Sequence, residues 1–258
     1  KEKDARAYVE QPIAQVPTRT AYTYASILAM VLGAVGGYLF HAGLFRQLRT
    51  RSFGAIFDLV RARPKLFLVM HVLLYGAFFE AMLRGAQLPL NNIALGQFVA
   101  NEFTTGGLQY VGDAYASGHV VRAAFATFVN NYVLQTLLLT FVLSLVVPLY
   151  LGVIKSTLSF LLVGFTMAPL WTGAASGYAY HVVTMVFELE AYIVACFAVT
   201  AWTTSLYRAI AAQIFPRVSA PSLLREFLAL SQAAALTGIM LALAAGYEAS
   251  TLIFFSHH

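Results

Sequence analysis

The chain has 258 residues, of which 60% are hydrophobic and only 10% are charged. A soluble domain is about 25% charged, so this composition excludes a surface that is mostly covered by water and indicates a membrane protein. The net charge of +5 does not indicate nucleic-acid binding, because the basic residues cluster between apolar runs, as membrane topology signals do. The single cysteine, Cys196, excludes an intramolecular disulfide.

Six apolar runs are predicted to span the membrane, judged with a window of about 20 residues. They cover residues 21–40, 66–83, 125–149, 157–171, 180–203 and 228–246, and the fourth is the shortest. Helices are expected, because lipid offers no partner for a bare backbone N–H or C=O. The predicted fold class is therefore all-α: a polytopic transmembrane helix bundle of about six spanning helices. It forms a single integral membrane domain over 1–258, with an N-terminal tail at 1–20.

The segment 41–65 joins the first two spans and is predicted to contain one amphipathic interfacial helix. Its basic residues outnumber its acids, and apolar residues recur among them at helical spacing, at Phe53, Ile56, Phe57 and Val60. Such a helix would lie on an anionic membrane face; a solvated basic loop is the alternative. Because arginine and lysine mark cytoplasmic loops, this segment, a short turn at Lys155 and the loop 204–226 are expected on the cytoplasmic side.

In this scheme the segment 85–124 and both termini face away from the cytoplasm. The segment mixes glycine, asparagine, threonine and tyrosine with apolar stretches such as 88–99. We expect an extracytoplasmic re-entrant or interfacial element there; an ordinary surface loop is the alternative.

Two glutamates, Glu188 and Glu190, lie inside the fifth apolar run. An ionisable group at membrane depth costs roughly 2.5 kcal/mol or more unless it is paired or protonated. On a helix, Glu188 lines up with His181 and Thr184. Glu190 points about 200° away, among apolar side chains. The two carboxylates therefore cannot act as a pair on one regular helix, and Glu190 should be protonated or meet a partner on another helix.

Polar residues on the second and third runs can supply partners. The second run carries His71 and Glu80, placed on roughly adjacent faces, and Asn130 and Asn131 open the third. Hydrogen bonds between membrane helices contribute about 0.6–2 kcal/mol each. Two interpretations stay open: structural bonds between helices, or a polar cluster that lines a cavity or proton path. The candidate cluster comprises Glu188, Glu190, His181, Thr184, Asn130, Asn131, His71 and Glu80.

No catalytic residue, metal site or cofactor is predicted. Histidines and glutamates are metal-ligand types, but no HExxH or other tight pair is present. Neither Ser144 nor Ser159 has the context of an intramembrane serine protease, and an intramembrane enzyme acting on lipid or peptide remains a third hypothesis. Without a Walker motif the chain is not expected to hydrolyse nucleotides itself, so an ATPase would be a separate subunit.

Three short motifs lie within residues 125–200. Phe128-Val129-Asn130-Asn131 opens a long apolar helix, a turn at Gly152 precedes an apolar helix containing Gly164, and Glu188-Leu189-Glu190-Ala191 follows. This part of the chain resembles the stage II sporulation protein M family of integral membrane proteins. It departs from that family at Thr184, near which the family usually has a His-Gly pair, and at Glu190, where a proline is usual.

The resemblance implies a non-catalytic integral membrane scaffold or assembly component of a larger complex. The expected location is the inner (cytoplasmic) membrane of a prokaryote. The expected partners are membrane lipids, other membrane or envelope proteins and further copies of the chain, because small residues around Gly36 and Gly238 let helices approach closely. The alternative is a transporter or permease-like subunit in which the polar cluster around Glu188 lines a solute, proton or lipid path.

Overall fold

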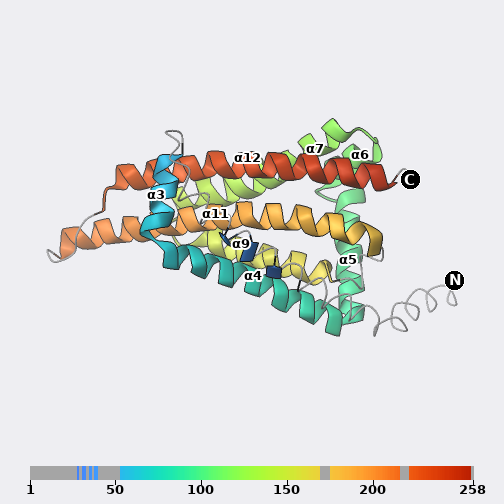
Figure 1. Ribbon diagram of the computed structural model, residues 1–258, viewed down its shortest axis with the longest axis horizontal. Coiled ribbons are helices and arrows are strands. Elements are labelled where there is room, and N and C mark those ends of the chain that lie inside the picture. Colours follow the sequence, from blue (N-terminus) through green and yellow to red (C-terminus); the bar gives the residue numbers. More distant parts are fainter. Residues whose placement is uncertain are drawn as a thin grey trace.

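The computed structural model describes residues 53–168, 175–215 and 221–256, with a few positions between 28 and 39. The side chains of residues 175–182 and 255–256 are not described. Every regular element in these ranges is a helix, and the long helices lie side by side (Figure 1). The all-α prediction is therefore confirmed for this part of the chain. The tail 1–20 and nearly all of the first predicted span, 21–40, lie outside it.

Four helices in the described ranges are long and apolar enough to cross a membrane. They match the second, third, fifth and sixth predicted spans; the predicted total of six is not confirmed. The bounds of these segments are Pro64–Gln87 (α4), Val120–Val146, Val183–Ile214 within α11 (Ala175–Ile214) and Leu223–Phe254 within α12 (Leu223–Ser256).

The fourth predicted span corresponds to α9, Leu151–Thr166, which has 16 residues. This helix is about 24 Å long, shorter than the roughly 30 Å of a bilayer's hydrocarbon core. Tyr150, just before it, has a left-handed backbone with φ 57°, and its hydroxyl contacts Thr204 at 3.3 Å. At the other end of α9, Phe165 accepts a hydrogen bond from Asn92. The helix thus returns the chain toward the end of the bundle where α11 begins.

Helix α11 is the central helix of the bundle. In its most apolar window 72% of the residues are buried, compared with 33% in α12 and 22% in Val120–Val146. It runs antiparallel to α4, because His71 contacts Glu190 and Arg63 contacts Ala201. The less buried helices expose apolar side chains that a membrane would cover. The polar groups of α11 lie among protein neighbours, because most of that helix is buried.

The third predicted span is not a uniform α-helix. It consists of α7 (Val120–Phe128), a π-helix η1 (Val129–Val142) and a final turn α8 (Leu143–Val146). Two threonine hydroxyls follow the i→i+5 spacing: Thr136 donates to the Asn131 carbonyl at 2.6 Å and Thr140 to the Gln135 carbonyl at 3.1 Å. π-helices are rare and frequently occur at functional sites, which draws attention to the residues that η1 carries.

The predicted amphipathic segment is helical in its described part, as α3 (Gly54–Ala62). Its apolar face does not rest on lipid: Ile56 and Phe57 are 0% and 3% exposed in the main core. Gln232 of α12 accepts hydrogen bonds from the first backbone N–H groups of α3, at 2.8 Å from Ala55 and 3.1 Å from Ile56. The interfacial prediction is therefore not borne out here, because protein covers the face assigned to the membrane.

The segment 85–124 is helical rather than a free loop. It contains the end of α4, then α5 (Pro89–Thr104), α6 (Gln109–Ala116) and the start of α7. Figure 1 shows α5 crossing one end of the bundle, opposite the end crossed by α3. The Asn92 amide of α5 donates to the Phe165 carbonyl at 2.5 Å, which fixes α5 to the end of α9.

Candidate functional site

Glu190 meets partners on another helix, as the helical projection predicted. Its carboxylate contacts His71 Nε2 at 3.1 Å and accepts a hydrogen bond from the Tyr75 hydroxyl at 2.9 Å. Both partners lie on α4, one turn apart. The His71 and Glu190 side chains are only 6% and 4% exposed. This pair is therefore enclosed by protein on a face of α11 turned toward α4.

The hydrogen bonds of His71 show how the pair shares its proton. Nδ1 lies 2.9 Å from the Phe67 carbonyl, which can only accept, so Nδ1 carries a proton. The contact between Nε2 and Glu190 then needs one further proton, held by either group. In both arrangements the pair carries no net charge, so burying it leaves no uncompensated ion. The Phe67 ring packs edge-on against the imidazole, with centroids 4.5 Å apart.

Glu188 faces a different set of groups, on η1. The Asn131 amide donates to its carboxylate at 2.8 Å, and the Asn130 amide donates to the Asn131 side-chain oxygen at 2.9 Å. The Tyr110 hydroxyl of α6 lies 3.4 Å from the Asn130 oxygen, as donor. Tyr110 is 41% exposed. A continuous chain of hydrogen bonds, which we call the tyrosine–asparagine chain, thus joins an exposed hydroxyl to a glutamate within a candidate span.

A second acid, Glu248 of α12, lies close enough to Glu188 for their charges to interact. Its carboxylate bonds to the Tyr115 hydroxyl of α6, which also lies 3.1 Å from the Thr127 hydroxyl. Burial, and then the charge of Glu248, raises the pKa of Tyr115, so this hydroxyl stays a neutral donor. Among the side chains described, only neutral groups hydrogen-bond to Glu188 and Glu248.

Glu248 is absent from the predicted cluster because the sixth predicted span ends at residue 246. In the structure α12 continues to Ser256. The apolar residues 252–255 were the available signal, since they extend the hydrophobic run beyond the glutamate.

The remaining predicted residues divide into three cases. Thr184 is buried at 2% exposure, one turn before Glu188. Glu80 does not join either glutamate: its side chain is 56% exposed and binds Arg84 at 2.8 Å. The side chain of His181 lies outside the described part of the chain.

Lys155 belongs to the interior rather than to a loop. It was expected in a cytoplasmic turn, but it lies in α9, and its ammonium donates to the Gln135 carbonyl of η1 at 3.1 Å. It also sits 5.7 Å from the centroid of the Tyr192 ring. Tyr192 follows Glu188 by one helical turn, so polar groups continue along the same face of α11.

The described residues contain no group of three histidine, cysteine, aspartate or glutamate side chains arranged to hold a metal ion. Comparison of the chain with protein-family models, with curated proteins and with solved structures found no match. The resemblance to stage II sporulation protein M therefore stays a prediction that rests on short motifs.

Proposed function

We propose that this chain is a proton-translocating, transporter-like membrane protein in which Glu188 accepts and releases protons. The observation that carries the proposal is the tyrosine–asparagine chain, which leads from the exposed Tyr110 hydroxyl to the Glu188 carboxylate. Ionisable groups within membrane segments commonly mark ion pathways and proton relays. The Glu188 carboxylate can itself take up and release a proton, whereas the asparagine amides carry no proton and hold the carboxylate in place by donating hydrogen bonds.

The cost of keeping Glu188 favours this role over simple packing. A neutral glutamine would make the same bond with Asn131 and avoid the penalty of an acid at membrane depth. The nearby Glu248 adds to that penalty, because two like charges oppose simultaneous ionisation.

The direction of the hydrogen bonds links protonation to helix contact. All three donors in the chain point toward Glu188, so the chain favours its charged form. Hydrogen bonds to charged groups are about twice as strong as bonds between neutral groups. Proton uptake therefore weakens the bond from Asn131, which joins α11 to η1. This coupling between charge and helix contact is what a proton-driven conformational step requires.

The same proposal includes location and orientation. Basic residues, among them Arg61, Lys65 and Arg225, gather at the end of the bundle where α3 lies. By the positive-inside rule that end faces the cytoplasm, which places Tyr110 on the outer side of a prokaryotic cytoplasmic membrane.

The test is proton flux into liposomes that contain the purified chain, measured with an entrapped pH-sensitive dye under a potassium diffusion potential. Wild-type protein should acidify the lumen, and Glu188→Gln should reduce the rate at least tenfold while its thermal unfolding midpoint stays within a few degrees. The matched control is Thr200→Val, a buried threonine of α11 outside the candidate cluster, which should conduct.

Two outcomes oppose the proposal. Equal flux through wild type and Glu188→Gln would remove Glu188 from the path. A wild-type chain that carries no protons but binds a defined membrane protein would favour the scaffold function that the family resemblance implies.

A further inference from the structure

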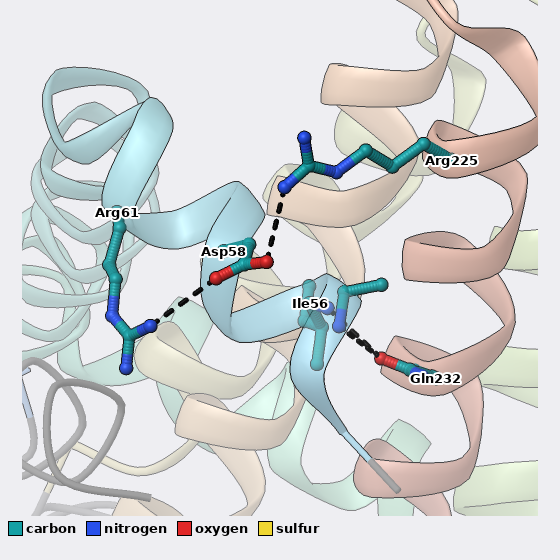
Figure 2. A network of polar contacts seen from close by, with 6 residues as sticks. Ile56, Asp58, Arg61, Arg225 and Gln232 are labelled. Atoms are coloured by element: carbon teal, nitrogen blue, oxygen red, sulfur yellow. Dashed lines mark hydrogen bonds and ion pairs between the residues drawn. The ribbon is translucent and has the colours of Figure 1, made fainter. Parts of the chain in front are cut away.

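Lys155 of α9 lacks the kind of partner that arginines at the α3 end of the bundle have. Figure 2 shows the Asp58 carboxylate 3.1 Å from Arg225 and 3.3 Å from Arg61. Lys155 is more shielded than these exposed arginines, yet it forms no ion pair with any carboxylate of the described residues. Its ammonium donates instead to a neutral group, the Gln135 carbonyl of η1, at 3.1 Å.

The Lys155 ammonium therefore has a charge that no described group cancels. The face of the Tyr192 ring lies 5.7 Å away and attracts a cation, but it carries no negative charge. An ammonium has three N–H donors, and the described residues supply a hydrogen-bond acceptor for one of them. Because buried charges are stable when they are paired, an anion beside Lys155 would supply what its protein neighbours do not.

A buried hydroxyl next to Lys155 also lacks an oxygen or nitrogen partner. Ser156 is 2% exposed, and its Oγ bonds to no oxygen or nitrogen of the described chain. It meets only the thiol of Cys196, which is a weak hydrogen-bonding group. The same thiol lies within electrostatic range of Lys155. An ammonium and a hydroxyl with spare donors thus lie around one buried side chain.

The types of donor indicate which anion suits this place. An arginine fork matches the two oxygens of a carboxylate or phosphate, whereas a lysine ammonium is a compact point charge. A point charge and a single hydroxyl favour a spherical anion with one negative charge. We propose that Lys155 and Ser156 bind a chloride ion.

The chloride site lies close to the proposed proton acceptor. Tyr192 follows Glu188 by one turn of α11, and its hydroxyl lies within electrostatic range of that carboxylate, while its ring faces Lys155. A bound anion would oppose the ionised Glu188 and favour its protonated form. Protonated Glu188 would favour the anion to the same degree, because coupling between two binding events is reciprocal. This coupling rests on the proposed function, whereas chloride binding itself does not.

Binding is measured by the width of the chloride NMR line in a solution of the purified chain in detergent. Wild-type protein should broaden the line beyond the width found with detergent alone, and bromide should remove the excess by competition. Lys155→Met should abolish the excess width, because the site loses its charge. Lys65→Met, an exposed lysine in the first turn of α4, is the matched control and should keep it.

Ser156→Ala keeps the test decisive if Lys155→Met does not fold. Removing a hydroxyl with no oxygen or nitrogen partner leaves no strong acceptor unpaired, so the thermal unfolding midpoint should not fall. Chloride affinity should nevertheless decrease by about tenfold, as expected for a lost hydrogen bond to a charged group. Thr203→Val is the matched control: this threonine is 1% exposed, its hydroxyl also lacks a partner, and chloride binding should be unchanged.

Two results would overturn the chloride site: no excess width in wild type, or equal affinity in wild type and folded Ser156→Ala. Acetate that competes as well as bromide would also overturn it, because the donors would not select a spherical anion. Proton flux without chloride binding contradicts this inference alone. Chloride binding in a wild-type chain that carries no protons supports the site and contradicts the proposed function.

Discussion

Glu188 and Glu190 are the same residue type, two positions apart on one helix, yet their surroundings differ in kind. Glu190 has an ionisable partner, His71, and an aromatic hydroxyl, both on α4. Glu188 has an amide donor and a second acid nearby. The first arrangement neutralises a buried charge and encloses it in protein, away from solvent. The second leaves Glu188 without an ionisable partner of opposite charge among the side chains described, which is why we propose a structural role for Glu190 and proton transfer for Glu188.

The largest effect is expected where the closed pair is opened. His71→Leu leaves Glu190 buried without its proton partner, and breaking a buried pair from one side typically costs 3–5 kcal/mol. The double variant His71→Leu, Glu190→Leu should recover most of that loss, because no ion remains. Chemical denaturation in mild detergent measures both. A single variant as stable as wild type would mean that the pair is not structural.

Removing the donor of Glu188 should have a smaller effect on stability. In Asn131→Leu the carboxylate loses its hydrogen bond, and bonds to charged groups contribute about 1.5–3 kcal/mol. Gln135→Leu, one π-turn further on, is the matched control for an amide on the same helix. Proton flux into liposomes should fall in Asn131→Leu and persist in Gln135→Leu. The reverse pattern would contradict a role of the tyrosine–asparagine chain in proton transport.

Glu188→Gln separates function from stability. The Asn131 amide can still donate to the new side-chain oxygen, so the free energy of unfolding should change by less than about 1 kcal/mol, although proton flux is lost. A decrease as large as that of His71→Leu would make the two glutamates alike and remove the distinction between them.

The smallest effect on stability is expected for Tyr110→Phe, at the exposed end of the tyrosine–asparagine chain. Its hydrogen bond to Asn130 is 3.4 Å long and exposed, so the free energy of unfolding should stay within about 0.5 kcal/mol. Flux should nevertheless fall, since Asn130 loses the hydrogen bond that helps to hold the amides in contact with Glu188. Unchanged flux would show that the function of Glu188 does not depend on the tyrosine–asparagine chain.

Helical periodicity predicted the most informative part of the site. It separated the faces of Glu188 and Glu190 and named His71 and Asn131 as available partners. The prediction that placed Glu80 on a face adjacent to His71 was wrong, because it departed from this periodicity. Nine residues correspond to a rotation of about 180°, and Arg84, four residues on, was the better partner to expect.

Other features could not be predicted, because they depend on contacts between distant segments. Gln232 accepts a hydrogen bond at the start of α3 although it lies 176 residues from Ile56. No local pattern in residues 41–65 predicts this contact. The π-helical bonding of η1 likewise has no clear signature in its apolar sequence. Only the threonines at 136 and 140 mark it, once the carbonyls they contact are known.

The π-helical stretch distinguishes the third span from the other candidate spans described, which are α-helical. Taking up one residue into ordinary α-helical bonding would rotate the segment before it by about 100° without unfolding it. Such a screw motion would turn Asn131 away from α11 and bring another side chain of η1 in its place. The chain could then exchange what Glu188 touches by a change of helical winding, at the cost of repacking α7 against α12 and α6.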